Sequence, residues 1–229
     1  MKKKIVVLTG AGISAESGLS TFRDSGGLWE GHNVMDVASP EGWRRNKELV
    51  LDFYNQRRRQ VLNAKPNDAH LALAELEKKF DVTIITQNVD DLHERAGSSN
   101  IIHLHGELNK ARSTTDENLI YELDGKDINP GDECENGSQL RPHIVWFGEM
   151  VPMMDEAIRH SLNADIFIVI GTSLVVYPAA SLLEFVKDDS PKYLIDPNKP
   201  GNYFRYNNLT FIKEKATKGT RELVQMLFK

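Results

Sequence analysis

The chain of 229 residues contains only one cysteine, Cys134. One sulfur cannot form a disulfide framework within the chain, and it cannot supply a cage of four thiolates for a metal ion. We therefore expect no structural zinc. The sparse use of cysteine also agrees with a cytoplasmic location.

The sequence also lacks an apolar run of the roughly 20 residues needed to cross a membrane. Lys2, Lys3 and Lys4 precede the apolar run Ile5–Leu8 and give a faint likeness to a secretory signal, but the run is too short and glycines soon follow it. A first buried strand explains this segment better, so we expect no membrane partner.

An excess of positive charge is missing too. The formal net charge is −5, which gives no global footprint for nucleic acid, and basic residues cluster only locally, as at Arg57–Arg59. Composition is otherwise that of a globular protein, with 40% hydrophobic and 27% charged residues. The length suffices for one sizeable core together with a small module.

Short apolar runs alternate with amphipathic stretches along the chain. Continuous apolar strands that alternate with helices predict an α/β fold, a Rossmann-like parallel sheet with helices on both faces. The expected strands are Ile5–Thr9, Val82–Thr86, Ile101–Leu104, Ile144–Phe147, Ile166–Ile170, Tyr193–Ile195 and Leu209–Ile212. The expected helices are Trp43–Leu62, Asn67–Phe80, Met153–Leu162, Pro178–Val186 and Arg221–Phe228.

One segment departs from this alternation. Residues 109–139 are polar, contain three glycines and show little apolar periodicity, so we expect a small inserted lobe or a long excursion there.

Polar residues follow five of the expected strands. In open α/β sheets, ligands bind in the crevice beyond the carboxyl ends of the strands, so these residues predict one shared site. They are Gly10-Ala11-Gly12, Gln87-Asn88-Val89-Asp90, His105-Gly106, Gly171-Thr172-Ser173 and Asp196-Pro197-Asn198. The first of these groups stands between a strand and the start of a short helix, which is the arrangement of a phosphate cradle.

The glycine turn satisfies the permissive G-x-G-x-x-A pattern of dinucleotide-binding enzymes. A dehydrogenase should then carry an acidic residue at the end of a second strand about 20 residues later. Glu30 and Asp36 stand at that distance, but neither ends an apolar strand, which disfavours hydride transfer. The irregular region 24–40 has the length of a flap over a ligand. Phe22 could shield a reactive centre and Arg23 could neutralise a phosphate, or they could be a core residue and a surface ion pair.

With these features in place, the chain resembles the sirtuins, a family of NAD-dependent protein deacylases. The matching segments occur in family order and read GAGISAESG at 10–18, FRD at 22–24, TQNVD at 86–90, HG at 105–106, FGE at 147–149 and GTS at 171–173. The resemblance implies one catalytic domain over residues 1–229, with a small lobe near 109–139 and a second contribution to it near 25–65. It also implies that NAD is consumed: the substrate's acyl oxygen attacks the anomeric carbon of the nicotinamide ribose, and nicotinamide and O-acyl-ADP-ribose are released.

The resemblance assigns roles to single residues. His105 matches the general base, and an unperturbed pKa of about 6.5 suits histidine to that task. Asn88 and Asp90 match catalytic positions that hold the nicotinamide ribose and carboxamide, although an Asx turn that caps a helix near Asp91 is an alternative. For His103 we expect a structural role, on the same face of the strand as His105. The implied NAD-binding residues are Gly10, Ala11, Gly12, Ser14, Phe22, Arg23, Trp29, Gln87, Asn88, Val89, Asp90, Gly171, Thr172, Ser173, Asp196, Pro197, Asn198 and Ala216.

Tyr54 and Arg57 resemble the Tyr-x-x-Arg pair of the sirtuin branch that removes acidic acyl groups. Residues three apart share a helix face, and a guanidinium fork matches a distal carboxylate. Ala38 would leave room for a longer acyl chain. These residues predict removal of succinyl or malonyl groups beside acetyl, and we assign Arg58 and Arg59 to a solvated face. Phe147 and Val176 lie in segments 147–151 and 173–176, which could flank an extended substrate peptide by main-chain pairing.

The chain departs from the family at two points. Most sirtuins carry two cysteine pairs that bind zinc between the HG and FGE motifs, whereas here that interval holds only Cys134, with Ser113 near the place of a first ligand. Asp196 stands where the family often has asparagine near the adenosine ribose, which leaves NAD affinity there open.

Two other functions stay open beside lysine deacylation. Mono-ADP-ribosylation of a protein side chain cannot be separated from it by sequence. A non-catalytic module that senses NAD or ADP-ribose is disfavoured because His105, Asn88 and Asp90 occur together. The expected partners are acylated lysine side chains of proteins, without nucleic acid, and we expect a monomer.

Overall fold

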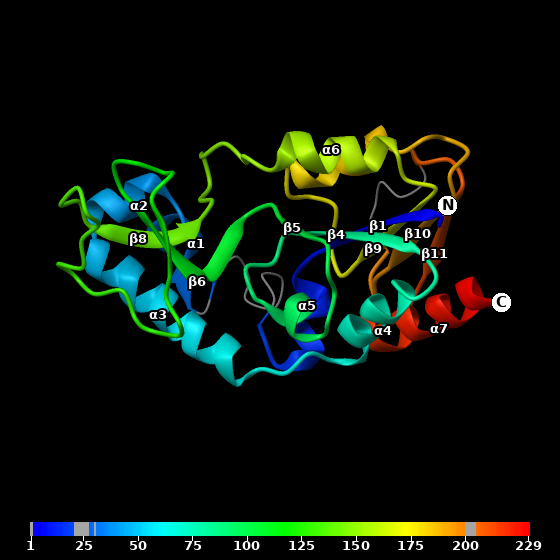
Figure 1. Cartoon of the computed structure of the whole chain (residues 1–229), viewed down its shortest axis with the longest axis horizontal. Helices are drawn as coiled ribbons and strands as arrows, with labels where there is room; N and C mark the ends of the chain where they lie inside the picture. Colours follow the sequence, from blue (N-terminus) through cyan, green and yellow to red (C-terminus); the bar gives the residue numbers. More distant parts are fainter. Residues whose placement is uncertain (1, 21–27, 30, 200–204) are drawn as a thin grey trace.

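The computed structural model describes residues 2–20, 28, 29, 31–199 and 205–229. Its large lobe is built on a six-stranded parallel sheet, and a small lobe lies at one end of the molecule (Figure 1). The sheet order is β11-β10-β9-β1-β4-β5. The strands are β1 (Lys4–Thr9), β4 (Asp81–Thr86), β5 (Ile101–His103), β9 (Ile166–Ile170), β10 (Lys192–Ile195) and β11 (Leu209–Ile212).

Both faces of this sheet are covered, which explains why its strands are apolar throughout. In β1, Ile5 and Val7 pack on one face and Val6 and Leu8 on the other. The first face is covered by α4 (Asp68–Leu76) and α7 (Ala216–Phe228). The second is covered by α6 (Met154–Leu162) and a 3₁₀ segment, η3 (Ala179–Phe185), and Figure 1 shows these two layers.

The strand ends that carry the predicted site are level with one another. Thr9, the last residue of β1, pairs with Thr86 of β4 on one side and with Ile170 of β9 on the other. The residues that follow these three strands therefore emerge at the same edge of the sheet. Three short elements follow there, η1 (Ala11–Ile13), η2 (Ala15–Ser17) and α5 (Leu92–Arg95).

The small lobe combines segments that are distant in the sequence. One part is helical, with α1 (Val34–Val37), α2 (Pro40–Arg45) and α3 (Lys47–Asn63), preceded by the short pair β2 (Leu28–Trp29) and β3 (His32–Asn33). The other is an antiparallel sheet of β7 (Ile120–Glu122), β6 (Gly106–Ser113) and β8 (Leu140–Ile144). Tyr54, Leu108 and Trp146 belong to the buried cluster between the two parts. The side chain of Asn55 in α3 also bonds the backbone of Ile128. Its Nδ2 donates to the Ile128 carbonyl at 2.9 Å, and its Oδ1 accepts from Ile128 N–H at 3.0 Å.

The predicted fold class and six of the seven predicted strands are confirmed. The strand expected at Ile144–Phe147 is wrong, because β8 ends at Ile144. The chain turns there: Phe147 N–H donates to the Ala38 carbonyl at 2.9 Å, and Gly148 has a φ of 90°.

The helix expected over Trp43–Leu62 is interrupted at Asn46. Its side chain accepts from Leu49 N–H at 3.0 Å, and it thereby caps a second helix. The segment expected as a helix at Pro178–Val186 is a 3₁₀ helix, and the short helix expected after Gly12 is replaced by two 3₁₀ segments, the first of which begins at Ala11. Residues 109–139 contain most of β6 and all of β7, so this region has more regular structure than its polarity indicates.

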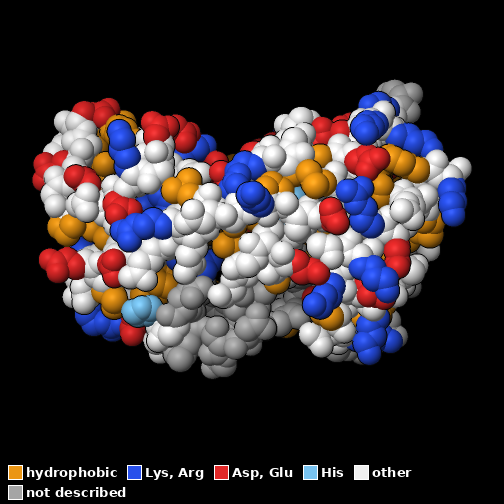
Figure 2. Space-filling view, turned by 90° about the horizontal axis from the view of Figure 1, so that it is seen from below, with side chains coloured by type: hydrophobic (Ala, Val, Ile, Leu, Met, Phe, Trp, Pro, Cys, Tyr) orange, Lys and Arg blue, Asp and Glu red, His pale blue; other side chains and the backbone are white. Residues whose placement is uncertain are grey.

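Within the described part of the chain, no helix is both long and apolar enough to span a bilayer. On the face drawn in Figure 2, the Lys and Arg side chains are interspersed with Asp and Glu. This mixture fits the small net charge of the sequence. The cytoplasmic location, the monomeric state and the domain bounds stay predictions.

Candidate active site

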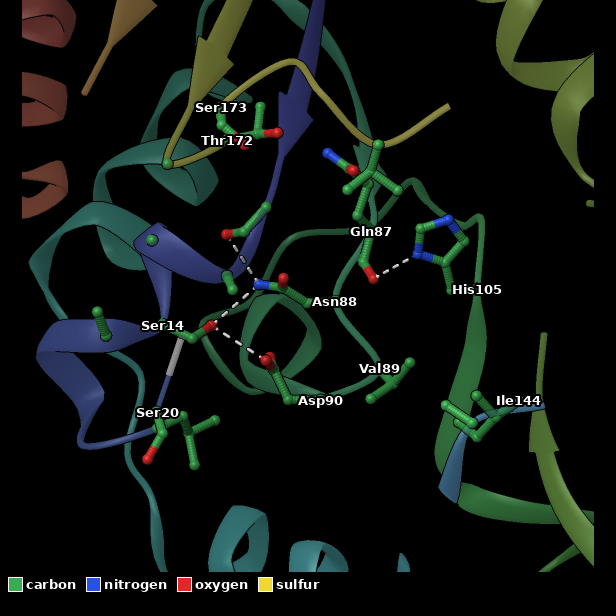
Figure 3. A pocket seen from close by; sticks show the side chains of 18 of the residues that line it. Ser14, Ser20, Gln87, Asn88, Val89, Asp90, His105, Ile144, Thr172 and Ser173 are labelled. Atoms are coloured by element: carbon green, nitrogen blue, oxygen red, sulfur yellow. Dashed lines mark hydrogen bonds between the residues drawn. The ribbon is translucent and has the colours of Figure 1, made fainter. Parts of the chain in front are cut away.

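One cavity of about 620 Å³ lies at the carboxyl edge of the parallel sheet and reaches the small lobe. It gathers residues that follow β1, β4, β5, β9 and β10, several of which Figure 3 shows pointing toward one another. From the predicted NAD set, its lining includes Gly10, Ala11, Gly12, Ser14, Gln87, Asn88, Val89, Asp90, Gly171, Thr172, Ser173, Asp196, Pro197, Asn198 and Ala216. The predicted base His105 and the predicted substrate residues Ala38, Tyr54, Arg57, Phe147 and Val176 also line it.

Three members of the predicted set cannot be placed in this cavity. Phe22 and Arg23 lie outside the described residues. Trp29 belongs to β2, and its side chain also lies outside the described part.

The loops after β1 and β9 pack backbone against backbone, and only glycine fits between them. A Cβ atom on Gly12 would lie 2.6 Å from the Gly171 Cα, and one on Gly10 would lie 2.8 Å from the Thr172 Cβ. Gly12 N–H donates to the Gly171 carbonyl at 2.9 Å. The close packing of the two loops therefore requires these glycines, and a phosphate or ribose can closely approach the main chain that they present to the cavity, so these loops fit a nucleotide.

A second set of contacts fixes the polar side chains on the floor of the cavity. Ser14 Oγ donates to Asp90 Oδ2 at 3.0 Å, and Asn88 Nδ2 donates to Ser14 Oγ at 3.1 Å and to the Gly10 carbonyl at 3.2 Å (Figure 3). All three side chains are buried. Burial raises the pKa of Asp90, against the opposing effect of its hydrogen bonds from Leu92 N–H and Ser14.

The Asx turn considered as an alternative for Asp90 is present, and Asp90 also lines the cavity. Asp90 Oδ1 accepts from Leu92 N–H at 3.2 Å at the start of α5, while its other oxygen faces Ser14. Asp91, the N-cap residue, makes no capping side-chain bond there and pairs with Arg95 and Asn109 instead.

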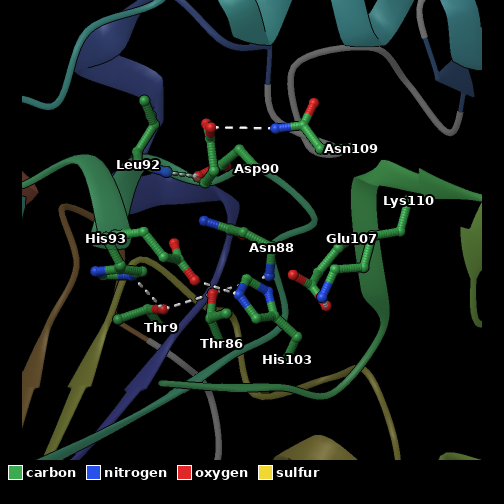
Figure 4. Close-up of polar contacts among 12 residues, drawn as sticks. Thr9, Thr86, Asn88, Asp90, Leu92, His93, His103, Glu107, Asn109 and Lys110 are labelled. Atoms are coloured by element: carbon green, nitrogen blue, oxygen red, sulfur yellow. Dashed lines mark hydrogen bonds and ion pairs between the residues drawn. The ribbon is translucent and has the colours of Figure 1, made fainter. Parts of the chain in front are cut away.

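Sequence reasoning missed a pair of hydrogen-bonded threonines, Thr9 and Thr86, next to the residues that line the site. Thr9 Oγ1 donates to Thr86 Oγ1 at 2.9 Å, and Asn88 N–H donates to that same Thr86 oxygen at 3.0 Å (Figure 4). Thr9 Oγ1 also lies 3.1 Å from Nε2 of the buried His93. The available signal in the sequence was the threonine at the end of each of these two apolar runs, Thr9 and Thr86.

His105 lines the cavity, and one nitrogen of its ring faces the main chain. Its Nδ1 atom is 3.0 Å from the Gln87 carbonyl oxygen, which can only accept a hydrogen bond. Nδ1 therefore carries the proton in the neutral ring, and Nε2 keeps its lone pair. Burial lowers the pKa of His105, so the neutral ring is the main form at neutral pH.

His103 has the structural role expected of it, but not the expected orientation. β5 ends at His103, so the two-residue alternation of a strand does not extend to His105. His103 Nε2 contacts Glu94 Oε1 at 2.6 Å (Figure 4), while His105 lines the cavity. Burial opposes protonation of His103, but its bond to Glu94 prevails and raises its pKa.

Tyr54 and Arg57 extend from α3 into the part of the cavity beside the small lobe. Both are buried, and Arg57 Nη1 lies 3.4 Å from Gln60 Oε1. The assignment of Arg58 to a solvated face is wrong, because this residue is 0% exposed. Its guanidinium donates to the Leu108 carbonyl and to Asn55 Oδ1, both at 2.7 Å, and burial lowers the pKa of Arg58 to about 10. Arg59 is exposed and pairs with Asp127, as a solvated residue should.

Glu16, which follows the glycine turn, links that turn to α7 by hydrogen bonds. Its carboxylate accepts from Thr217 N–H at 3.0 Å and from Thr217 Oγ1 at 2.9 Å. A carboxylate is favourable at a helix N-terminus, and this one holds Ala216 at the edge of the cavity. It also explains why α7 begins before the predicted Arg221.

No cluster of three or more His, Cys, Asp or Glu side chains suited to a metal ion occurs among the described residues. In the interval between the HG and FGE motifs, Ser138 Oγ contacts Ser113 Oγ at 2.7 Å, Thr115 Oγ1 at 3.0 Å and Cys134 Sγ at 3.1 Å. Hydroxyls and one thiol thus occupy the region where the family's cysteine pairs are expected.

Comparisons with known proteins agree with this geometry. The model of the Sir2 family matches residues 10–178. A Helicobacter pylori protein named NAD-dependent protein deacylase is 58% identical over 225 residues, which cover 98% of this chain and 97% of that protein. A solved Sir2 homologue–NAD complex has a TM-score of 0.88 at 44% identity and covers 99% of this chain and 90% of that one. A Sir2 bound to acetylated peptide has a TM-score of 0.83 at 32% identity, with 99% and 94% covered.

The fold and the cavity therefore define an NAD-binding protein of the sirtuin type. This chain belongs to the Sir2 family, as its motifs predict.

Proposed function

We propose that this protein removes succinyl and malonyl groups, as well as acetyl groups, from protein lysines. NAD-dependent lysine deacylation follows from family membership and from the full-length similarity to a curated deacylase. The preference for acidic acyl groups is supported by one observation: Tyr54 and Arg57 are buried in the lining of the same cavity as His105.

NAD, when bound, supplies the ribose carbon to which the acyl oxygen is transferred. The backbone at Gly10, Gly12 and Gly171 would lie against its phosphates, since these residues line the cavity and carry no side chain. Asn88 and Asp90 would orient ribose hydroxyls and the carboxamide, because their own hydrogen bonds to Ser14 hold them in place. His105 would take up a proton at Nε2, which the Gln87 carbonyl keeps unprotonated.

Arg57 would bind the distal carboxylate of an acidic acyl group, with Tyr54 as an additional donor. A guanidinium offers two parallel N–H donors to a carboxylate, and burial strengthens such a contact by excluding water. Ala38, also in the lining, is small enough to leave space for the longer chain.

The peptide around the acylated lysine would lie along the rim of the cavity. Phe147 and Val176 line that cavity and are 44% and 36% exposed. Exposed apolar side chains beside loop backbone suit an extended peptide that pairs through its main chain. The solved Sir2 bound to acetylated peptide shares the fold of this chain.

Mono-ADP-ribosylation remains the second candidate, since it would use the same NAD site. The buried Arg57 favours acidic deacylation, because transfer to a protein side chain does not call for an arginine in the acyl region of the cavity.

The test is to incubate the protein with NAD and matched acetyl-, succinyl- and malonyl-lysine peptides and to follow the peptides by mass spectrometry. We expect NAD-dependent loss of each acyl group and none with His105→Ala. Removal of the acetyl group, with the succinyl and malonyl groups left on their peptides, would refute the proposed activity on acidic acyl groups. A gain of ADP-ribose on a peptide, with no deacylation, would favour the transferase.

A further inference from the structure

The hydroxyl of Tyr54 is held by an indole that the family motifs leave unassigned. Trp146 Nε1 donates to Tyr54 Oη at 3.0 Å, and both side chains are buried. The two residues come from different segments, since Tyr54 lies in α3 and Trp146 follows β8. The contact therefore joins the helix that carries Arg57 to the segment that carries the FGE motif.

Trp146 is itself fixed from several sides. The Arg141 guanidinium carbon lies 3.3 Å from the centroid of its ring, and the Trp43 ring centroid lies 5.7 Å away. Trp146 N–H donates to Glu149 Oε2 at 2.8 Å, and Arg141 Nη1 donates to Glu149 Oε1 at 2.7 Å. Glu149 thus fixes both the backbone of Trp146 and the arginine stacked on its ring.

The direction of this hydrogen bond matters for the phenol. An indole N–H can only donate, so the Tyr54 oxygen is the acceptor. A phenol proton lies near the ring plane in one of two orientations, and the indole occupies the acceptor side. The proton of Tyr54 is therefore directed away from Trp146, and accepting one hydrogen bond strengthens the phenol as a donor in the next.

We propose that Trp146 is a positioning residue for acidic acyl groups, which directs the Tyr54 hydroxyl as a donor toward the distal carboxylate bound by Arg57. This inference rests on the proposed function. Burial also raises the pKa of Tyr54, so the phenol keeps its proton over the working pH range. An acetyl group has no distal carboxylate, so the effect of Trp146 is confined to acidic substrates.

A packing role alone makes a different prediction. Phenylalanine at position 146 keeps an aromatic ring for Arg141 to stack on and removes only the indole N–H and part of the ring area. If Trp146 served as packing, this change would affect all acyl substrates alike, because the small lobe forms one wall of the cavity for each of them.

The experiment compares Trp146→Phe, Tyr54→Phe and their double variant on acetyl- and succinyl-lysine peptides, with kcat and KM measured separately. Trp43→Phe is the matched control, since it removes an indole from the same aromatic cluster and leaves the Trp146–Tyr54 pair in place. Circular dichroism and the unfolding midpoint verify that each variant is folded.

We expect Trp146→Phe to raise the KM for the succinyl peptide roughly 3- to 10-fold, the loss expected for one hydrogen bond, with little change for the acetyl peptide. In the Tyr54→Phe background the same change should have almost no further effect, because the hydroxyl on which it acts is gone. Trp43→Phe should not alter the ratio of the two activities.

Equal losses on acetyl and succinyl peptides would overturn the inference, and so would an undiminished effect of Trp146→Phe in the Tyr54→Phe background. In both cases the proposed function would still hold, provided that the wild-type protein removes succinyl groups. A wild-type protein that removes acetyl but not succinyl groups would overturn the proposed function, and the inference with it.

Discussion

The Nδ1 atom of His105 lies 3.0 Å from the carbonyl oxygen of Gln87. This contact fixes the tautomer of the ring, and burial lowers the pKa of His105. The two residues follow different strands, β5 and β4, so the sheet itself sets the geometry of the base.

The first prediction concerns the pH dependence of deacylation. Because the base form of His105 is neutral and burial lowers its pKa, kcat/KM should fall on the acid side with a midpoint below the usual value of about 6.5. His105→Ala should reduce kcat by about 100-fold or more at every pH. A pH–rate profile measures both effects, with His160→Gln in α6, a histidine outside the cavity lining, as the control. A midpoint above 6.5 would contradict this assignment.

Acid stability provides a second prediction, from two buried histidines behind the site. The rings of His70 and His93 lie 4.9 Å apart, and burial lowers both pKa values, that of His70 to about 4. In the unfolded chain both titrate near 6.5, so below that pH the unfolded state binds more protons. The free energy of unfolding should therefore decrease as the pH falls from about 6.5 to 4, by up to about 3 kcal/mol from His70.

Urea unfolding at several pH values measures this decrease. His70→Gln retains an acceptor for Asn67 N–H but removes the titration, so its stability should depend less steeply on pH over the same range. Identical slopes for the wild type and the variant would show that His70 is not responsible.

A third prediction concerns the small lobe without zinc. The contacts of Ser138 with Ser113, Thr115 and Cys134 should hold this region without a metal. Ser138→Ala should lower the free energy of unfolding by about 1 kcal/mol, whereas EDTA should leave the unfolding midpoint of the wild type unchanged. Elemental analysis that finds one zinc per chain would contradict the account.

Elements could be predicted correctly from the sequence where neighbouring residues alone carry the pattern that specifies them. Strands β1 and β9 are buried on both faces, so each shows as a continuous apolar run that ends in the glycines or polar residues of the site. The motif residues then share a cavity because the strand ends are level.

The errors arose where long-range contacts decide the structure. Arg58 is a charged residue in a basic run, and nothing near it in the sequence shows that the Leu108 carbonyl, 50 residues away, accepts its hydrogen bond. The role of Trp146 was hidden for the same reason, because its partner Tyr54 lies 92 residues earlier. The break at Asn46 had a local signal, a helix-capping residue inside an amphipathic stretch, which the apolar periodicity outweighed.

We propose that Arg57 enables this Sir2-family cavity to bind acidic acyl groups in addition to acetyl groups. The most direct test is the ratio of kcat/KM for succinyl- and acetyl-lysine peptides in the wild type, in Arg57→Met and in the control Arg59→Met. Methionine keeps the apolar stem of the buried arginine, and Arg59 is exposed on the same helix. We predict that Arg57→Met lowers this ratio by about 10- to 100-fold, as loss of a charged hydrogen-bond pair requires, while Arg59→Met leaves it unchanged. An unchanged ratio in Arg57→Met would contradict the claim.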